Sequence, residues 1–413
     1  MKTTHQLLSL FTLGFALAAN AANQNLVLPN VSTGADGALN AAVSQIIQLP
    51  PDGRLNYTTI NIQAGASVTF LRNAANTPVY LLAQGDVTID GNIDVSGAAG
   101  DALRGGVPGP GGFAGGMPGV NGGAPGDGLG PGAGLAGSAD GTIPGGGGAY
   151  GTRGGAGCAS VPSRNGQTYG SQLLLPLVGG SGGGGGQELG GGGGGGAILV
   201  ASSTKIILSG WINAFGGNAG VGTQGGGSGG AVRLLAPTIE GSGTIYVDGD
   251  YGVGGICEYR SGAGRIRCDM VERSGFNITR TPNIIPTLAN PPTPALLGNI
   301  APFTIDQYLP LVLPPNLPSL RILSIGGIAV PANADAGYTV TLPLNAAELQ
   351  PVIVEAANFG VQVPIAIKRT LPSGPSQPAT EATIDNSAVN PATLTLSLPF
   401  PANTPVTVNV WTR

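Results

Sequence analysis

GGAILVASSTKIILSGWINAFGG, residues 195–217, is followed 34 residues later by GGAVRLLAPTIEGSGTIYVDGD (229–250) and, after another 34, by AGRIRCDMVERSGFNITR (263–280). Each unit reads as a strand, a small polar turn and one or two further strands that close on glycine. The stretch PVYLLAQGDVTIDGNIDVSG (78–97) has the same plan. One such unit cannot bury its apolar face alone, so its repetition predicts the stacked coils of an all-β, parallel β-helix-like solenoid.

Apolar residues of these units are expected to line the interior of the solenoid as a ladder from coil to coil. They are Ile198, Val200, Ile206, Ile207 and Leu208 in one coil, and Val232, Leu234, Ile239, Ile245 and Val247 in the next. In DVTIDGNIDVSG (86–97), read as one strand, the alternation of apolar residues places Asp86, Asp90 and Asp94 together on the outer face.

The segment 97–196 has a different character, because it holds 43 of the 75 glycines together with scattered proline and alanine. A loop of this length is uncommon in a compact domain unless it is disordered or forms a special backbone-packed structure. Only glycine lets extended chains approach closely enough to hydrogen-bond to one another, as at the axis of collagen. We expect a long polyglycine-II-like insertion between two solenoid coils, with disorder as the alternative.

Two further regions follow the repeats. Residues 281–318 contain ten prolines, which is typical of a semi-rigid spacer. From 319 to 413 about seven short alternating strands, among them YTVTLPL, QPVIVEA, VPIAIKR, TLTLSLP and PVTVNVW, favour an Ig-like β-sandwich. The predicted organisation is a signal peptide at 1–21, N-terminal solenoid coils at 22–96, a Gly-rich insertion at 97–196, C-terminal solenoid coils at 197–280, a Pro-rich linker at 281–318 and a sandwich at 319–413.

The N-terminus has the layout of a secretory signal: Met1-Lys2, an apolar run from Leu7 to Ala18, and a small-residue triplet ending at Ala21. Cleavage after Ala21 leaves 16 basic and 21 acidic residues, a net charge of −5, and no histidine. That charge argues against nucleic acid or an anionic membrane as a partner, and the chain has no membrane-spanning segment. An extracellular or cell-surface location is expected.

Three cysteines, Cys158, Cys257 and Cys268, fit an oxidising compartment. A two-residue turn at Gly262–Ala263 would place Cys257 opposite Cys268 across a hairpin, so these two are the predicted disulfide. The alternative is that all three are reduced and buried. A metal site built from them is disfavoured, because the mature chain has no histidine to complete it.

The runs LVLPNVSTGADGALN (26–40), LNYTTINIQAGASVTF (55–70), VYLLAQGDVTIDGNIDVSG (79–97) and GGGSGGAVRLLAPTIEGSGTIYVDG (225–249) are similar to those of bacterial glycine-rich secreted exoproteins. The resemblance spans roughly residues 26–280 and implies an adhesin-like β-solenoid with a C-terminal Ig-like domain. It implies export and architecture, and it carries no catalytic residue over to this chain.

Without histidine, the mature chain cannot build a Ser-His-Asp triad, a Cys-His pair or a histidine-ligated metal site. Its two Gly-x-Ser-x-Gly matches, at 179–183 and 226–230, lie in glycine tracts and follow from composition. A polysaccharide-active enzyme would need paired carboxylates, or a base beside them. The candidates are Asp86, Asp90 and Asp94, and a group of Asp248, Asp250, Glu258 and Asp269 near Arg260, Arg265 and Arg267. We favour solvated turns and surface salt bridges for both groups, with calcium binding as an alternative.

Aromatic residues are sparse, at 5% of the chain, but several fall within or beside the predicted coils. If Trp211, Tyr246 and Tyr251 are exposed they could stack on sugar rings, and interior packing is the alternative. We therefore expect a secreted or cell-surface structural or adhesive protein without catalytic activity or cofactor. A carbohydrate-binding module or a polysaccharide-active β-helix enzyme is the alternative, and extracellular polysaccharide or self-association is the expected partner.

Overall fold

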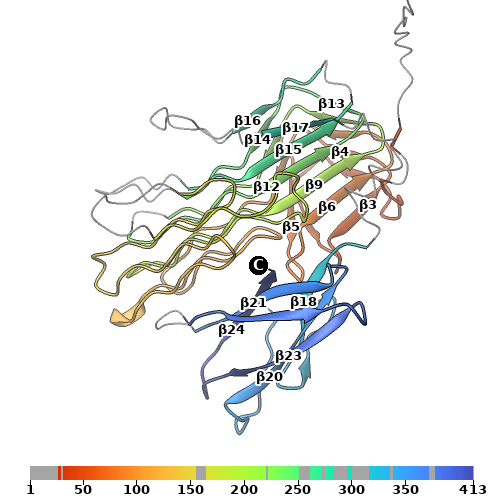
Figure 1. The fold of residues 1–413 in the computed structure, drawn as a ribbon. Helices are drawn as coiled ribbons and strands as arrows, with labels where there is room; N and C mark the ends of the chain where they lie inside the picture. Colours follow the sequence, from red (N-terminus) through yellow and green to blue (C-terminus); the bar gives the residue numbers. More distant parts are fainter. Residues whose placement is uncertain are drawn as a thin grey trace, which may run out of the picture.

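The computed structural model describes residues 27–28, 31–154, 164–219, 222–250, 261–271, 275–281, 295–299, 316–334, 338–371 and 377–412. Within them the only helix is a three-residue 3-10 turn, Val120–Gly122 (η1), and none is long and apolar enough to cross a membrane. The strands between Leu39 and Asn299 form three parallel sheets, and those between Ser319 and Thr412 form two antiparallel sheets (Figure 1).

The three parallel sheets are the faces of a solenoid. Sheet A contains β1 (Leu39–Ala41), β4 (Ile60–Ile62), β7 (Val87–Ile89), β10 (Lys205–Leu208) and β13 (Thr238–Glu240). Sheet B contains β2 (Gln45–Gln48), β5 (Ser67–Leu71), β8 (Asn92–Asp94), β11 (Trp211–Asn213), β14 (Thr244–Tyr246) and β16 (Thr279–Thr281). Sheet C contains β3 (Arg54–Tyr57), β6 (Val79–Ala83), β9 (Ala197–Ser202), β12 (Ala231–Leu235), β15 (Arg265–Met270) and β17 (Ala295–Asn299).

The register of sheet C reproduces the 34-residue period, because Ala197 pairs with Ala231 and Ala231 with Arg265. The predicted interior residues stack inside the solenoid and are fully buried, with one exception. Ile207 lies between the buried Ile206 and Leu208 and is only half-buried, because alternate residues of a strand point to opposite faces of its sheet. The prediction of Ile207 as an interior residue was therefore wrong.

The stretch 86–97, expected to be one strand, is two strands in different sheets. The chain turns between β7 and β8 at Gly91, where an added Cβ would lie 2.3 Å from the carbonyl oxygen of Ala66. Asp86 precedes a strand of sheet A, whereas Asp94 ends a strand of sheet B. The three aspartates therefore do not share one face, although all are at least partly exposed.

Three of the chain segments that lead from sheet B to sheet C are rich in glycine, and their described residues run side by side. They are residues 95–196 between β8 and β9, 214–230 between β11 and β12, and 247–264 between β14 and β15. In Figure 1 they extend together from one side of the solenoid. We call this assembly the bundle. The bundle therefore contains connecting segments of two neighbouring coils in addition to the predicted 97–196 insertion.

The central chain of the bundle, Gly190–Gly196, shows how its chains are held. Its N–H groups donate to three neighbouring chains in turn, at 2.7 to 2.9 Å. Gly190, Gly193 and Gly196 donate to Asp101, Ala98 and Val95; Gly191 and Gly194 to Gly116 and Phe113; Gly192 and Gly195 to Gly225 and Ser228. Partners that recur every third residue are what an extended helix with three residues per turn produces.

The carbonyl groups of the same chain accept from other neighbours, including Gly106 and Gly109 on one side and Gly183 and Gly180 on another. Side chains are excluded from this space: a Cβ added at Gly194 would lie 1.9 Å from the carbonyl oxygen of Gly180. The high glycine content thus permits backbone-to-backbone packing, and the described residues of this segment form extended, hydrogen-bonded chains.

The outer face of sheet C is also buried, unlike the outer faces of sheets A and B. Its outward-facing Tyr80 and Leu199 pack in an apolar cluster with Leu174 and Leu177, which cover the sheet. Beside this cluster Asp269 is fully buried, and its Oδ2 accepts from Arg233 Nη2 at 2.8 Å. A second guanidinium contacts the same carboxylate, because Arg267 Nη2 lies 2.7 Å from Asp269 Oδ1.

The C-terminal part contains two antiparallel sheets around a separate apolar core. One sheet has β18 (Ser319–Ile325), β19 (Ile328–Ala329), β20 (Leu349–Ala357) and β23 (Ala392–Pro399), and the other has β21 (Gln362–Thr370), β22 (Thr380–Asp385) and β24 (Thr407–Thr412). YTVTLPL (338–344), expected to be a strand, forms none, and its residues are largely exposed. β17 falls within 281–318, the predicted spacer, where it pairs with β15.

An ion pair and a ring contact between described residues join the bundle to the C-terminal sheets. Lys368 on β21 lies 3.5 Å from Asp127, measured from Nζ to Oδ2, and Phe113 meets Trp411 edge-on with ring centroids 6.2 Å apart. Burial lowers the pKa of Lys368 below 10.5, and the Asp127 carboxylate opposes this shift only in part.

The lowered pKa of Lys368 predicts a pH dependence of stability. Between the lowered value and 10.5 the folded protein binds fewer protons at this site than the unfolded chain. The Lys368 contribution to the free energy of unfolding should therefore rise with pH through that window. Urea unfolding at pH values up to about 10 should show this slope, and K368M should flatten it. Equal slopes in the two proteins would contradict the assignment.

Candidate functional site

The outer face of sheet B is the exposed surface on which predicted site residues meet. On β5, β8 and β11 it carries Ser67, Asn92 and Trp211 in one row across the strands. The amide of Asn92 donates to Ser67 Oγ at 3.1 Å, and the amide of Asn213 donates to Asn92 Oδ1, also at 3.1 Å. Uncharged polar side chains therefore bond to one another across three strands.

Trp211 is the most exposed aromatic residue of this face. Its side chain lies on β11 with 55% of the residue exposed, while its neighbour Ile212 is buried in the solenoid core. Tyr246 on β14 is half-buried and packs against Phe215, with ring centroids 5.1 Å apart. An exposed indole beside hydroxyl and amide groups is the combination that stacks on sugar rings and bonds their hydroxyls.

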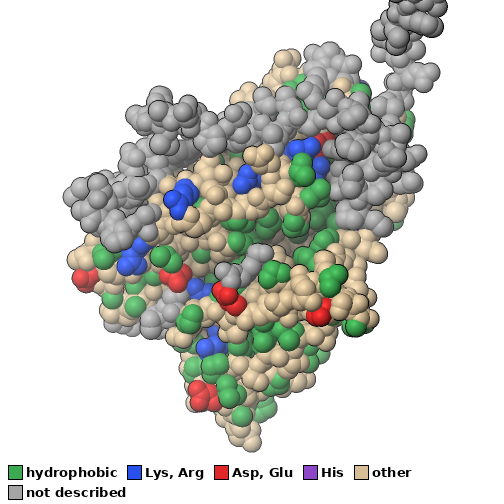
Figure 2. Space-filling model, in the orientation of Figure 1, with side chains coloured by type: hydrophobic (Ala, Val, Ile, Leu, Met, Phe, Trp, Pro, Cys, Tyr) green, Lys and Arg blue, Asp and Glu red, His purple; other side chains and the backbone are tan. Residues whose placement is uncertain are grey.

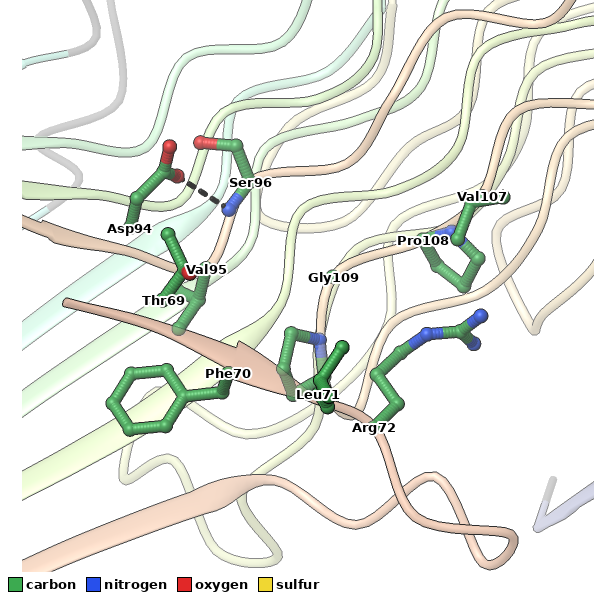
Figure 3. Close-up of a pocket in the computed structure, with 11 residues that line it drawn as sticks. Thr69, Phe70, Leu71, Arg72, Asp94, Val95, Ser96, Val107, Pro108 and Gly109 are labelled. Atoms are coloured by element: carbon green, nitrogen blue, oxygen red, sulfur yellow. Dashed lines mark hydrogen bonds between the residues drawn. The ribbon is translucent and has the colours of Figure 1, made fainter. Parts of the chain in front are cut away.

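A pocket of about 380 Å³ opens where this face meets the bundle (Figure 3). Its solenoid wall is formed by Thr69, Asp94 and Ser96, and its bundle wall by residues 107–110. The Ser96 N–H donates to Asp94 Oδ1 at 2.8 Å, which fixes the carboxylate at the end of β8. Arg72 extends from the end of β5 towards Val107 and Pro108. Burial lowers the pKa of this guanidinium.

The sequence indicates Trp211, Tyr246 and Asp94 as candidate site residues, but it does not predict that they lie on one face of one sheet. The register places them there, because Asp94 pairs with Asn213 and Asn213 with Tyr246 on adjacent strands. The pocket itself had no sequence signal. It exists because residues 107–110 of the bundle fold back beside strands that precede them in the chain. Tyr251, the third aromatic candidate, lies outside the described residues.

The predicted disulfide falls partly outside the described residues, since Cys257 is not among them, and neither is Cys158. Cys268 is buried in the solenoid core on β15. The turn expected at Gly262–Ala263 is absent: Gly262 donates to Gly148 and Gly264 to Val247, as an extended chain of the bundle. The hairpin argument for the disulfide was wrong, and the Cys257–Cys268 pairing stays a prediction.

The second carboxylate group is not solvated, contrary to expectation. Asp248, Asp250 and Asp269 are 3%, 5% and 0% exposed. Asp250 Oδ2 accepts the Ala219 N–H at 2.6 Å within the bundle, and Asp269 is held by Arg233 and Arg267. These carboxylates hold chains together. Glu258 and Arg260 lie outside the described residues, and Arg265 reaches the Tyr169 carbonyl and stacks over Tyr150.

The two serines of the Gly-x-Ser-x-Gly matches have a structural role in the bundle. Ser181 and Ser228 are fully buried, and the Ser181 N–H donates to Ser228 Oγ at 2.8 Å. Ser181 Oγ donates to the Tyr169 hydroxyl at 3.0 Å. Neither serine lies at an exposed turn where a nucleophile would meet substrate.

A larger hollow of about 1780 Å³ lies between the solenoid and the C-terminal sheets. In Figure 2 hydrophobic side chains gather along it and charged ones are scattered. Burial in its wall raises the pKa of Tyr80 to about 12. Of its carboxylates, Asp52 belongs to the solenoid, and Glu355 on β20 accepts from Arg321 Nε at 2.7 Å. The hollow is chiefly apolar.

These features define an all-β protein with a parallel, solenoid-like body, a glycine-rich bundle and two C-terminal antiparallel sheets. Comparison with protein-family models, with curated proteins and with solved structures found no match to the chain. The resemblance to glycine-rich exoproteins noted from the sequence gains no support from these comparisons.

Proposed function

We propose that this chain is an exported adhesive protein of the cell surface or extracellular space, without catalytic activity. The outer face of sheet B carries the proposal. It presents the exposed Trp211 and a row of bonded, partly exposed polar side chains, while the reverse side of the same strands completes the solenoid core. Flat polar and aromatic surfaces are suited to binding extended ligands.

The rest of the fold supports the same role. A bundle of polyglycine-II type, with its backbone groups bonded in three directions, leaves little unprotected chain for proteases to cleave. The C-terminal sheets, which we interpret as an Ig-like sandwich, supply a second compact unit. The single carboxylate in the small pocket, Asp94, is bonded to backbone and is not paired with a second one there.

The test is binding of the purified protein from residue 22 onward to immobilised polysaccharides and cell-surface extracts, with release of reducing or unsaturated ends followed in the same wells. Retention on one or more surfaces without release of ends is the expected result. Turnover of any polymer would overturn the non-catalytic function, and failure to bind any surface would overturn the adhesive one.

A further inference from the structure

We infer that the outer face of sheet B binds a neutral polysaccharide, with one end of the bound segment in the Asp94 pocket and the chain passing over Trp211. This inference rests on the proposed adhesive function and names its ligand and site.

The pocket and Trp211 belong to one continuous surface. Asp94 ends β8, and Trp211 begins β11, the next strand of the sheet. Residues placed diagonally on adjacent strands are about 7–8 Å apart. The pocket continues past Asp94 to Thr69 on β5. Thr69 therefore lies two strand spacings across the sheet and two residues along it from Trp211, about 12 Å away, a span that about three sugar rings can cover.

The chemistry along this path suits hydroxyl groups. The Asp94 carboxylate is an acceptor for sugar hydroxyls, and its Oδ1 is already oriented by Ser96. The guanidinium of Arg72, on the pocket wall, is a donor. Trp211 supplies the apolar surface against which the face of a sugar ring packs. A pocket of about 380 Å³ is within the range of small-ligand sites.

Charge selects a neutral glycan over an anionic one. On β5, β8, β11 and β14 the outward positions are Ser67, Thr69, Leu71, Asn92, Asp94, Trp211, Asn213, Thr244 and Tyr246. Asp94 is the one charged residue among them. The pocket wall adds the guanidinium of Arg72, so the formal charges of Asp94 and Arg72 cancel, and a uronate or sulfate would gain no net attraction there.

The test uses fluorescence titration of the full mature chain. The protein has two tryptophans, and W411F leaves Trp211 as the reporter. Soluble β-glucan, α-mannan and galactan are the neutral probes, and polygalacturonate is the anionic one. We expect one or more neutral probes to change Trp211 emission in a saturable way, and affinity to increase from monosaccharide to about trisaccharide length.

Variants then locate the site. W211A and D94N, made in the wild-type background and followed by calorimetry, should each weaken binding of the neutral probe by roughly tenfold or more. D94N keeps an oxygen to accept the Ser96 N–H, so the end of β8 should stay in place. Y338A, which removes another exposed aromatic residue in the C-terminal part, is the matched control and should leave affinity unchanged.

The outcomes separate this inference from the function on which it rests. Binding to polygalacturonate alone, or neutral binding unaffected by W211A and D94N, would overturn the inference and leave an adhesive protein with another site. Polymer turnover, or no binding to any surface in the retention assay, would overturn the proposed function itself. Loss of binding in Y338A equal to that in W211A would also overturn the assignment of the site.

Discussion

G194A should lower the free energy of unfolding of the bundle by about 3 kcal/mol or more. The new Cβ would lie 1.9 Å from the carbonyl oxygen of Gly180, a backbone atom that cannot move without carrying its whole chain with it. Gly194 also donates to Phe113 and accepts from Gly109, so chains forced apart would lose bonds on several sides. The cost exceeds that of a surface substitution because buried donors and acceptors would be left without partners.

Hydrogen–deuterium exchange of peptides from 97–196 measures this effect locally, and thermal unfolding measures it globally. Backbone amides around Gly194 should lose protection in the variant. G360A is the control, because nothing lies within 4 Å of the added Cβ; its effect should stay within about 1 kcal/mol. Unchanged exchange in G194A would mean that these chains are not packed backbone to backbone.

D269N should destabilise the solenoid by about 3–5 kcal/mol. The substitution keeps the size of the side chain but removes its charge, and Arg233, which is 3% exposed, is left buried without a counter-ion. Arg267 Nη2, 2.7 Å from the other oxygen, loses the same partner. A buried charge whose counter-ion has been removed is costly because neither water nor another anion replaces it.

E240Q is the matched control for that substitution. Glu240 lies 4.0 Å from Lys205 Nζ, and 38% of its side chain is exposed, so water and salt already weaken the pair. Its loss should cost about 0–1 kcal/mol. Urea unfolding of both variants, followed by circular dichroism, gives the comparison. Similar midpoints for D269N and E240Q would show that Asp269 is not the buried counter-ion described above.

Much of the body of the protein could be predicted from local pattern. The 34-residue spacing between β9 and β12, which stacks the buried Ile198 beside Val232, follows from the need of each coil to bury one face against its neighbours. The prediction failed at the corners. The alternation of apolar residues continues across the turn at Gly91, so it predicts one strand over 86–97. That prediction placed Asp86 on the same face as Asp94, although they lie in or beside strands of different sheets.

The candidate site shows the same division. The sequence leaves two alternatives for Trp211, exposure to solvent or interior packing. A strand pattern assigns a residue to one face of a sheet, but it does not show whether another segment covers that face. Sheet C illustrates the other outcome: its outward-facing Leu199 is buried under the cluster that includes Leu174. The pocket needs residues 107–110 beside Asp94, a contact between segments that only the folded chain brings together.

The sequence by itself determined the β-solenoid, through its repeat and its alternation, and determined that side chains could not fill the region 97–196, through its glycine. Tertiary structure decided which chains bond to Gly190–Gly196, which carboxylates are buried, and which sheet face stays open. The physical reason is the distance along the sequence over which each property is decided. Alternation and glycine content act on neighbouring residues, whereas burial of Asp269 or exposure of Trp211 depends on chain segments far away in the sequence that pack against them or leave them uncovered.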